Sequence, residues 1–212
     1  MPGLFISFEG GEGVGKSTQI RRLADRLRAG GHDVVVTLEP GGTPLGVELR
    51  RLVLQPGGHV TPRAEALLYA ADRAHHVATV IEPALAAGKI VITDRYVDSS
   101  LAYQGVGRAL DPAQMADLCE FAVGGRWPDA TILLDADPVI GLGRARGEGA
   151  GDRIEAESLE FHTAVRAAFL DLARESPQRF TVVDAAGSVV EVTQRVDAAI
   201  DRRLESLSEA GR

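Results

Sequence analysis

Gly10-Gly11-Glu12-Gly13-Val14-Gly15-Lys16-Ser17 is the stretch on which the fold of this chain depends. It has the form G-x-x-x-x-G-K-[ST], in which backbone N–H groups surround a polyphosphate, the lysine reaches its terminal phosphates and the hydroxyl reaches Mg²⁺. An apolar run at 4–8 precedes this loop, and a helical pattern at 16–29 follows it. A buried strand, a glycine-rich loop and a helix in this order predict a nucleoside triphosphate site formed by the loop together with Thr18.

Lys16 is distinctive because the chain has 21 Arg but only two Lys. An arginine fork is a poor substitute for a compact ammonium group among phosphates. With the residue frequencies of this chain, chance would supply roughly 0.002 matches to the loop pattern. The alternative, a glycine-rich surface turn with an incidental lysine, does not account for the strand and the helix on either side.

The composition is that of an ordinary globular protein. The chain has 212 residues, of which 45% are hydrophobic and 25% charged, enough for one large domain with a closed core. The net charge of −7 argues against nonspecific nucleic-acid binding. No apolar run is long enough for a membrane span and no signal peptide is recognisable, so we expect a cytoplasmic protein. The single cysteine, Cys119, is expected to be a buried thiol and not a nucleophile.

Strand-like apolar runs alternate with helical patterns along the chain. The predicted strands cover 4–8, 33–38, 89–93, 130–134 and 180–183, and the predicted helices cover 16–29, 45–54, 62–87, 111–123, 138–146, 158–176 and 189–207. This alternation predicts right-handed crossovers and a five-stranded parallel sheet with flanking helices, in one three-layer α/β domain spanning residues 1–212. Pro83 lies inside a long predicted helix and is expected to kink it. Ligands are expected at the carboxyl ends of the strands.

Polar residues follow the predicted strands at this edge of the sheet. Residues 39–43 follow the second strand, and residues 94–96 follow the third. On the long helix, Tyr69 and Arg73 are four residues apart and therefore share one face. A ring beside a guanidinium group can serve as a platform for a nucleobase, although an exposed cation–π pair is the alternative interpretation.

Taken together, these motifs resemble those of thymidylate kinases, P-loop enzymes that transfer phosphate from ATP to dTMP. The matching blocks, in order, are Phe8-Glu9-Gly10 through Thr18, Glu39-Pro40-Gly41-Gly42-Thr43-Pro44-Leu45-Gly46, Ala70-Ala71-Asp72-Arg73, Asp94-Arg95-Tyr96, Ser99-Ser100-Leu101-Ala102-Tyr103-Gln104-Gly105 and Asp152-Arg153-Ile154-Glu155. The resemblance covers nearly the whole chain. It implies a P-loop nucleoside-monophosphate-kinase-like fold, ATP and dTMP as substrates, Mg²⁺ as cofactor and a homodimer.

The resemblance also implies a function for individual residues. For the acceptor site it places Glu12 near the 3′-hydroxyl of the sugar, Arg95 on the monophosphate and Arg73 on the thymine edge. Ser100 and Gln104 lie where the family contacts the base, and Tyr103 lies where a ring crowds a ribose 2′-hydroxyl. The other residues expected to help form the acceptor site are Glu39, Pro40, Arg50 and Ser99. Ser17 and Asp94 match the residues that organise Mg²⁺. Two positions depart from the common pattern: Tyr69 stands where a Phe usually stacks on thymine, and Leu38 stands where an Arg is frequent.

The expected chemistry is positioning and charge stabilisation, with Lys16, Arg95, Glu12 and Arg153 as its main residues. The acceptor phosphate is already ionised, so we expect no catalytic triad, no phosphoenzyme and no catalytic histidine. Family members carry an arginine either in the P-loop or on a lid, and Gly13 occupies the loop position here. We therefore expect a mobile lid around 144–155, with Arg153 at the transferring phosphate and with Arg144 and Arg146 on adenine or the phosphates. The alternative for this segment is a solvated charged loop.

Two other functions stay open from the sequence. One is a different nucleoside monophosphate or deoxynucleoside kinase on the same architecture, against which the blocks at 39–46 and 99–105 argue. The other is a P-loop nucleotide switch or partition-type ATPase. The chain has no Asn-Lys-x-Asp string, which argues against a guanine-nucleotide switch.

Overall fold

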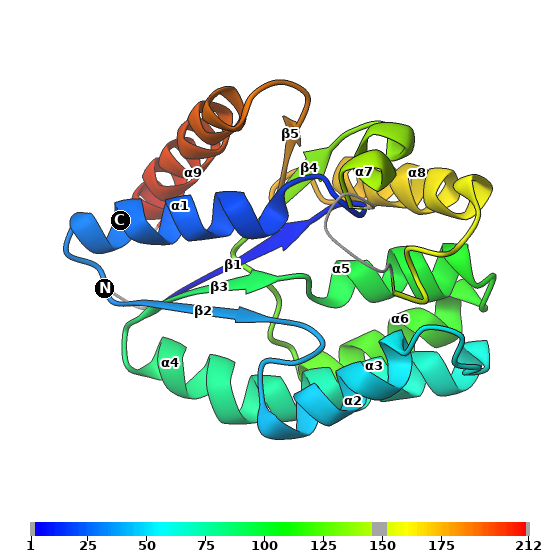
Figure 1. The fold of residues 1–212 in the computed structure, drawn as a ribbon. Helices are drawn as coiled ribbons and strands as arrows, with labels where there is room; N and C mark the ends of the chain where they lie inside the picture. Colours follow the sequence, from blue (N-terminus) through cyan, green and yellow to red (C-terminus); the bar gives the residue numbers. More distant parts are fainter. Residues whose placement is uncertain (1–2, 146–151, 211–212) are drawn as a thin grey trace.

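A five-stranded parallel sheet forms the centre of the molecule (Figure 1), with strand order β2-β3-β1-β4-β5. The computed structural model describes residues 3–145 and 152–210, the last five of them through their backbone only. The strands are β1 (Leu4–Glu9), β2 (Val34–Leu38), β3 (Ile90–Asp94), β4 (Ala130–Asp135) and β5 (Phe180–Asp184). The helices are α1 (Lys16–Ala29), α2 (Pro44–Leu54), α3 (Pro62–His76), η1 (Val77–Ile81), α4 (Glu82–Ala86), α5 (Val97–Ser100), η2 (Leu101–Gly107), α6 (Pro112–Val123), α7 (Pro138–Ala145), α8 (Leu159–Glu175) and α9 (Val189–Ala210).

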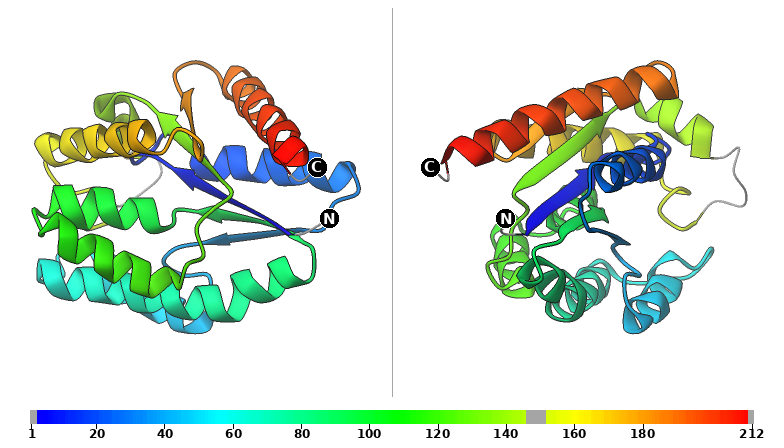
Figure 2. Two further views of the ribbon diagram at one scale, coloured as in Figure 1. Left: turned by 180° about the vertical axis from the view of Figure 1, so that it is seen from behind. Right: turned by 90° about the vertical axis from the view of Figure 1, so that its left-hand side faces the viewer.

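Helices cover both faces of the sheet, as the predicted crossovers require (Figure 2). Side chains alternate along β1, so that Ile6 and Phe8 pack toward α1 and α9 while Phe5 packs toward α3 and α6. All three of these side chains are fully buried. Burial of a large apolar side chain stabilises the fold by about 1.5–3 kcal/mol, so this strand is held from both sides.

The strand register brings separate sequence motifs to one edge of the sheet. Phe8 pairs with Asp94, and Asp94 pairs with Leu38, in parallel ladders. The segments that follow these three residues therefore leave the sheet side by side. This is where a doubly wound sheet binds its ligands.

The predicted elements agree with the structure to within a few residues at each end. The long predicted helix is observed as α3, η1 and α4, and its π-helical turn ends at Ile81, two residues before Pro83. Proline lacks the N–H of an α-helical hydrogen bond, and a wider turn accommodates its ring. The helical segment formed by α5 and η2 was not predicted. Its buried face includes Ser and Gln residues, so the sequence lacks the apolar periodicity that predicts a helix. None of the helices in the described residues is long and apolar enough to cross a membrane.

Candidate active site

The glycine-rich loop connects β1 to α1 and holds the lysine side chain close to its own backbone. Gly10, Gly13 and Gly15 have positive φ, which glycine adopts without strain. The ammonium group of Lys16 donates hydrogen bonds to the carbonyls of Gly11 at 2.7 Å and Gly10 at 3.2 Å. Burial and the nearby charge of Arg95 lower the pKa of Lys16. The loop thus holds a largely dehydrated cation next to the helix N-terminus, where anions are favoured.

No side chain fits at Gly13 in this packing. A Cβ atom there would lie 1.9 Å from the carbonyl oxygen of Gly141 in α7. Conversely, a Cβ on Gly141 would lie 2.2 Å from the carbonyl oxygen of Glu12. An arginine at this loop position would therefore push α7 away from the loop. This contact was not predicted from the sequence.

Ser17 and Asp94 meet at the mouth of the loop. The Ser17 hydroxyl donates to Asp94 Oδ2 at 2.9 Å, although the two residues are 77 positions apart. A hydroxyl and a carboxylate are hard oxygen ligands of the kind that Mg²⁺ prefers alongside substrate phosphates. The donor set therefore fits the predicted magnesium site.

A hollow lies beside the glycine-rich loop, and we call it the acceptor cleft. Every residue predicted for the acceptor lines it, together with three that were not predicted. The lining residues are Glu12, Glu39, Pro40, Arg50, Leu54, Tyr69, Arg73, Arg95, Ser99, Ser100, Tyr103, Gln104, Asp152 and Ile154.

Arg95 joins the acceptor cleft to the glycine-rich loop. Its guanidinium donates to Glu12 Oε1 at 2.6 Å, to the Gly10 carbonyl at 3.0 Å and to Ser99 Oγ at 3.2 Å. Burial opposes ionisation of Glu12, but the charges of Arg95 and Lys16 outweigh it and lower its pKa to about 2. The Gly10 carbonyl accepts one hydrogen bond from Lys16 and another from Arg95. The glycine-rich loop and the acceptor cleft are therefore linked through this one oxygen atom.

Glu9 supports the unusual backbone of Arg95. Arg95 has a φ of 68°, in the left-handed region that costs a side-chain-bearing residue free energy. The fully buried carboxyl of Glu9 accepts from the Tyr96 N–H at 2.8 Å and from Ser99 Oγ at 2.6 Å. Burial and the neighbouring Asp98 raise the pKa of Glu9 to about 8. Glu9 is the last residue of β1, directly before the glycine-rich loop, but its sequence position gave no hint of this contact.

Arg73 is buried at the floor of the cleft and fixed on several sides. Its guanidinium donates to Glu39 Oε2 at 2.8 Å, to Ser100 Oγ at 2.9 Å and to the Tyr96 carbonyl at 3.0 Å. It also lies over the ring of Tyr96, 5.4 Å from the centroid. Arg73 and Tyr69 do share the cleft, but the cation–π partner of Arg73 is Tyr96 and the pair is not an exposed one.

A buried carboxyl lies beside this cluster. Asp72 is 1% exposed, and neither of its carboxyl oxygens has a side-chain donor among the described residues. Burial and the charge of Glu39 raise the pKa of Asp72 from 3.8 to about 6. A Cβ on Gly46 would lie 2.2 Å from Asp72 Oδ1, so the start of α2 packs directly on this carboxyl.

The pKa of Asp72 predicts a pH-dependent stability. Because the folded-state pKa lies above the unfolded value, the contribution of Asp72 is present at low pH and is lost as pH rises through about 6. Asp72→Asn should therefore raise the free energy of unfolding by about 2 kcal/mol at pH 8 and leave it unchanged below pH 4. Urea unfolding at both pH values measures this. The exposed Asp117→Asn is the control, and an equal gain at the two pH values would contradict the assignment.

The predicted lid arginines lie in three different situations. Arg144 is exposed in the last turn of α7. Arg146 lies outside the described residues, as does half of the predicted lid, residues 146–151. Arg153 stands between Asp152 and Ile154, two residues that line the acceptor cleft, and its Nε donates to the Val53 carbonyl at 2.8 Å while its Nη2 donates to Glu65. In this conformation Arg153 is paired with Glu65 and not with the glycine-rich loop.

A triphosphate-binding loop and an acceptor cleft that meet at one carbonyl define a P-loop kinase of the nucleoside-monophosphate type. The comparisons specify it further: the thymidylate kinase family model matches residues 8–196. The chain belongs to the thymidylate kinase family.

Relatives and a solved structure agree over nearly the full length. Thymidylate kinase of Clavibacter michiganensis is 53% identical over 214 residues, covering 100% of this chain and 99% of the relative. That of Deinococcus radiodurans is 51% identical, covering 95% and 98%. The crystal structure of thymidylate kinase from Ehrlichia chaffeensis has a TM-score of 0.76 and 32% identity, covering 94% of this chain and 99% of that one.

Proposed function

We propose that this chain transfers the γ-phosphate of ATP to dTMP, giving dTDP and ADP, as a step of dTTP synthesis. Membership of the thymidylate kinase family supports this reaction. The observation that carries the proposal in the structure is the shared Gly10 carbonyl, which accepts from Lys16 on the donor side and from Arg95 on the acceptor side. Two cations 79 positions apart in sequence are thereby held where two phosphates must meet.

The proposed mechanism is direct transfer between two bound phosphates. Lys16 and the loop amides would hold the β- and γ-phosphates, and Arg95 would hold the monophosphate. Glu12 would receive the sugar hydroxyl, and its charge also keeps Arg95 oriented. Because the monophosphate is already an anion, the reaction needs no general base and no covalent intermediate. The binding free energy serves to align the reacting atoms, which can lower the barrier considerably.

We propose Mg²⁺ as the metal cofactor, held by Ser17 and Asp94. Bound Mg²⁺ would neutralise charge on the β- and γ-phosphates during transfer. The contact between the serine hydroxyl and the carboxylate supports this assignment, since both oxygens already face one another.

The transition-state cation is proposed to be Arg153, with Arg144 and Arg146 on the donor nucleotide. Arg153→Ala should lower kcat by about 10³-fold or more while changing the dTMP dissociation constant little, because an arginine of this kind acts on the transferring phosphate. Single-turnover kinetics and dTMP titration measure the two quantities separately. Arg174→Ala, at an exposed ion pair with Asp171, is the control. An unchanged kcat would remove Arg153 from the mechanism.

The acceptor is tested by measuring ADP release with ATP, Mg²⁺ and each of dTMP, dUMP, AMP, GMP and CMP. We expect dTMP to be the best acceptor, with dUMP next because it lacks only a methyl group. A preference for AMP, GMP or CMP would establish another monophosphate kinase. Binding of ATP without phosphorylation of any monophosphate would favour the nucleotide switch.

The wider setting of the enzyme is also proposed. We infer that residues 1–212 form one kinase domain. We also infer a homodimer, which the exposed side chains of Leu67 on α3 and Phe121 on α6 support. Their side chains are 58% and 86% exposed on helices that pack against each other. A buried, unpaired Cys119 suits the reducing cytoplasm. Analytical ultracentrifugation measures the oligomeric state.

A further inference from the structure

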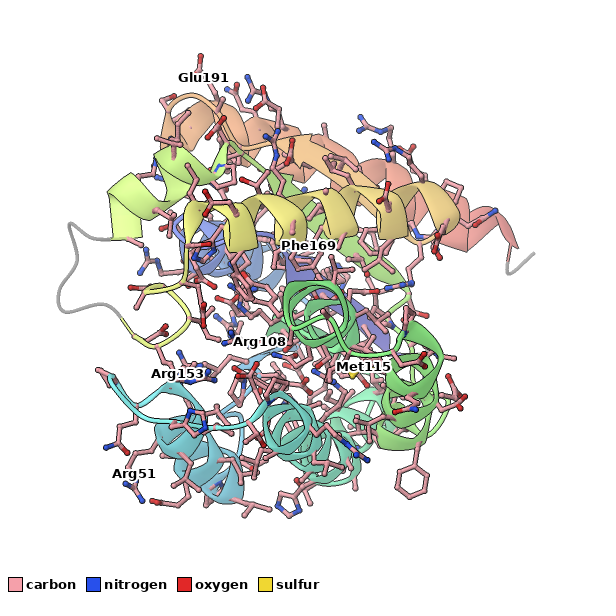
Figure 3. The ribbon with its side chains drawn as sticks, turned by 90° about the vertical axis from the view of Figure 1, so that its right-hand side faces the viewer. Arg51, Arg108, Met115, Arg153, Phe169 and Glu191 are labelled. Atoms are coloured by element: carbon pink, nitrogen blue, oxygen red, sulfur yellow. The ribbon has the colours of Figure 1, made fainter. Side chains whose placement is uncertain are left out.

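Glu65 is a buried carboxylate that three donors surround. It lies in the first turn of α3 and is fully buried. Its Oε1 accepts from Gln104 Nε2 at 2.8 Å and from Arg108 Nε at 3.3 Å, and its Oε2 accepts from Arg153 Nη2. Arg108 and Arg153 approach it from different segments (both labelled in Figure 3). Glu65 is the acceptor in all three of these contacts, and a carboxylate paired with guanidinium groups has no hydrogen to donate.

This arrangement fixes which way the amide of Gln104 points. An acceptor-only partner requires the NH₂ group of the amide, so the carbonyl Oε1 of Gln104 must point elsewhere. Gln104 is 2% exposed and lines the acceptor cleft with Arg73 and Ser100. The cleft therefore receives a hydrogen-bond acceptor from Gln104. Arg73 supplies the complementary donor, because only three of its five N–H groups are used in its contacts with Glu39, Ser100 and Tyr96.

We propose that Glu65 determines base specificity by locking the amide of Gln104. This inference rests on the proposed function and goes one step beyond it. An acceptor beside a donor matches a pyrimidine edge that presents N3–H next to a carbonyl, as thymine and uracil do. Cytosine presents the reverse, an unprotonated N3 next to an amino group. A site built to pair with polar groups discriminates strongly against a ligand that leaves those groups unpaired.

The test is E65Q, assayed for kcat/KM with dTMP, dUMP and dCMP. A neutral amide at position 65 can accept or donate, so the Gln104 amide is free to reverse. We expect the preference for dTMP over dCMP to fall by about ten- to a hundredfold, the range that one base-edge contact supplies. The dTMP to dUMP ratio should not change, because both bases present the same edge.

Two matched variants separate this effect from loss of packing. E65D keeps an acceptor-only carboxylate, and R108Q removes a neighbouring cation while leaving the carboxylate in place. Both are expected to retain the preference for dTMP over dCMP, whatever their overall activity. If the preference for dTMP over dCMP fell as much in R108Q as in E65Q, the proposal would be overturned. An unchanged preference in E65Q would overturn it as well.

Folding of each variant is checked by circular dichroism. If E65Q does not fold, the double variant E65Q/R108Q, in which one unpaired guanidinium group is also removed, takes its place with the same expected change. N3-methyl-dTMP adds a test on the unmodified protein: without its N–H it should be at least about tenfold poorer than dTMP as an acceptor. Equal use of the two would contradict the proposed amide orientation. Failure of the unmodified protein to phosphorylate dTMP would instead disprove the proposed function.

Discussion

Replacing Lys16 with alanine is expected to lower kcat for dTMP phosphorylation by roughly 10²–10³-fold, the loss typical of removing one preorganised charged donor. The reason is the position of the side chain: Lys16 is 7% exposed, and its ammonium group donates to the carbonyls of Gly10 and Gly11. A largely dehydrated cation interacts with phosphate charge more strongly than a solvated one does. Alanine leaves the loop backbone in place, so nucleotide binding should weaken less than catalysis. A coupled assay for ADP measures kcat, and titration with a fluorescent ATP analogue measures binding.

Lys89 provides the control for this experiment, because it is the other lysine of the chain. It immediately precedes β3, at the end of the strand opposite Asp94. Lys89→Ala should therefore leave kcat unchanged. Lys16→Arg is a second informative variant: it keeps the charge, but a planar fork does not fit a cradle made for a compact ammonium group, and activity should stay low. Full activity in Lys16→Ala would contradict the donor site and with it the proposed mechanism.

The sheet and the composition of the site could be predicted because their signals are local. Each strand is a short apolar run, and several polar residues of the site directly follow β1, β2 and β3. Parallel strands bring their carboxyl ends together, so Glu39 and Arg95 could be expected near the glycine-rich loop without knowing any contact. In the structure these residues line one cleft, while their functions in binding and catalysis stay predictions.

The contacts that orient the site residues could not be predicted, because they join positions far apart in the sequence. Glu65 reaches Gln104 over 39 positions and Arg153 over 88. No periodicity encodes such pairs, and a carboxylate in the first turn of a helix is usually explained by the helix dipole alone. The contacts of Glu9 were equally unpredictable, because its two donors come from the segment after β3, about ninety residues later. Sequence motifs thus located the predicted ligand-binding residues but not the residues that orient their side chains.

Arg73→Met is expected to lower the free energy of unfolding by about 3–5 kcal/mol, the cost of removing one partner of a buried ion pair. Arg73 and Glu39 are each 2% exposed, and they are joined at 2.8 Å. Methionine fills much of the space but leaves the Glu39 carboxylate without its guanidinium partner in a low-dielectric surrounding. The remaining hydrogen bond from His76 Nδ1 to Glu39 Oε1 offsets only part of this loss. Urea unfolding followed by circular dichroism measures the change.

A double-mutant cycle identifies the unpaired carboxylate as the cause. Glu39→Gln in the Arg73→Met background removes the buried charge, so the double variant should be more stable than Arg73→Met alone. Arg51→Met is the matched control, because the ion pair of Arg51 with Glu48 is exposed and its loss should not be measurable. If the two substitutions at 39 and 73 instead destabilised the protein additively, packing and not charge would explain the effect, since coupled residues depart from additivity. The same pair holds Arg73 against the floor of the cleft, so stability and base recognition should fail together in Arg73→Met.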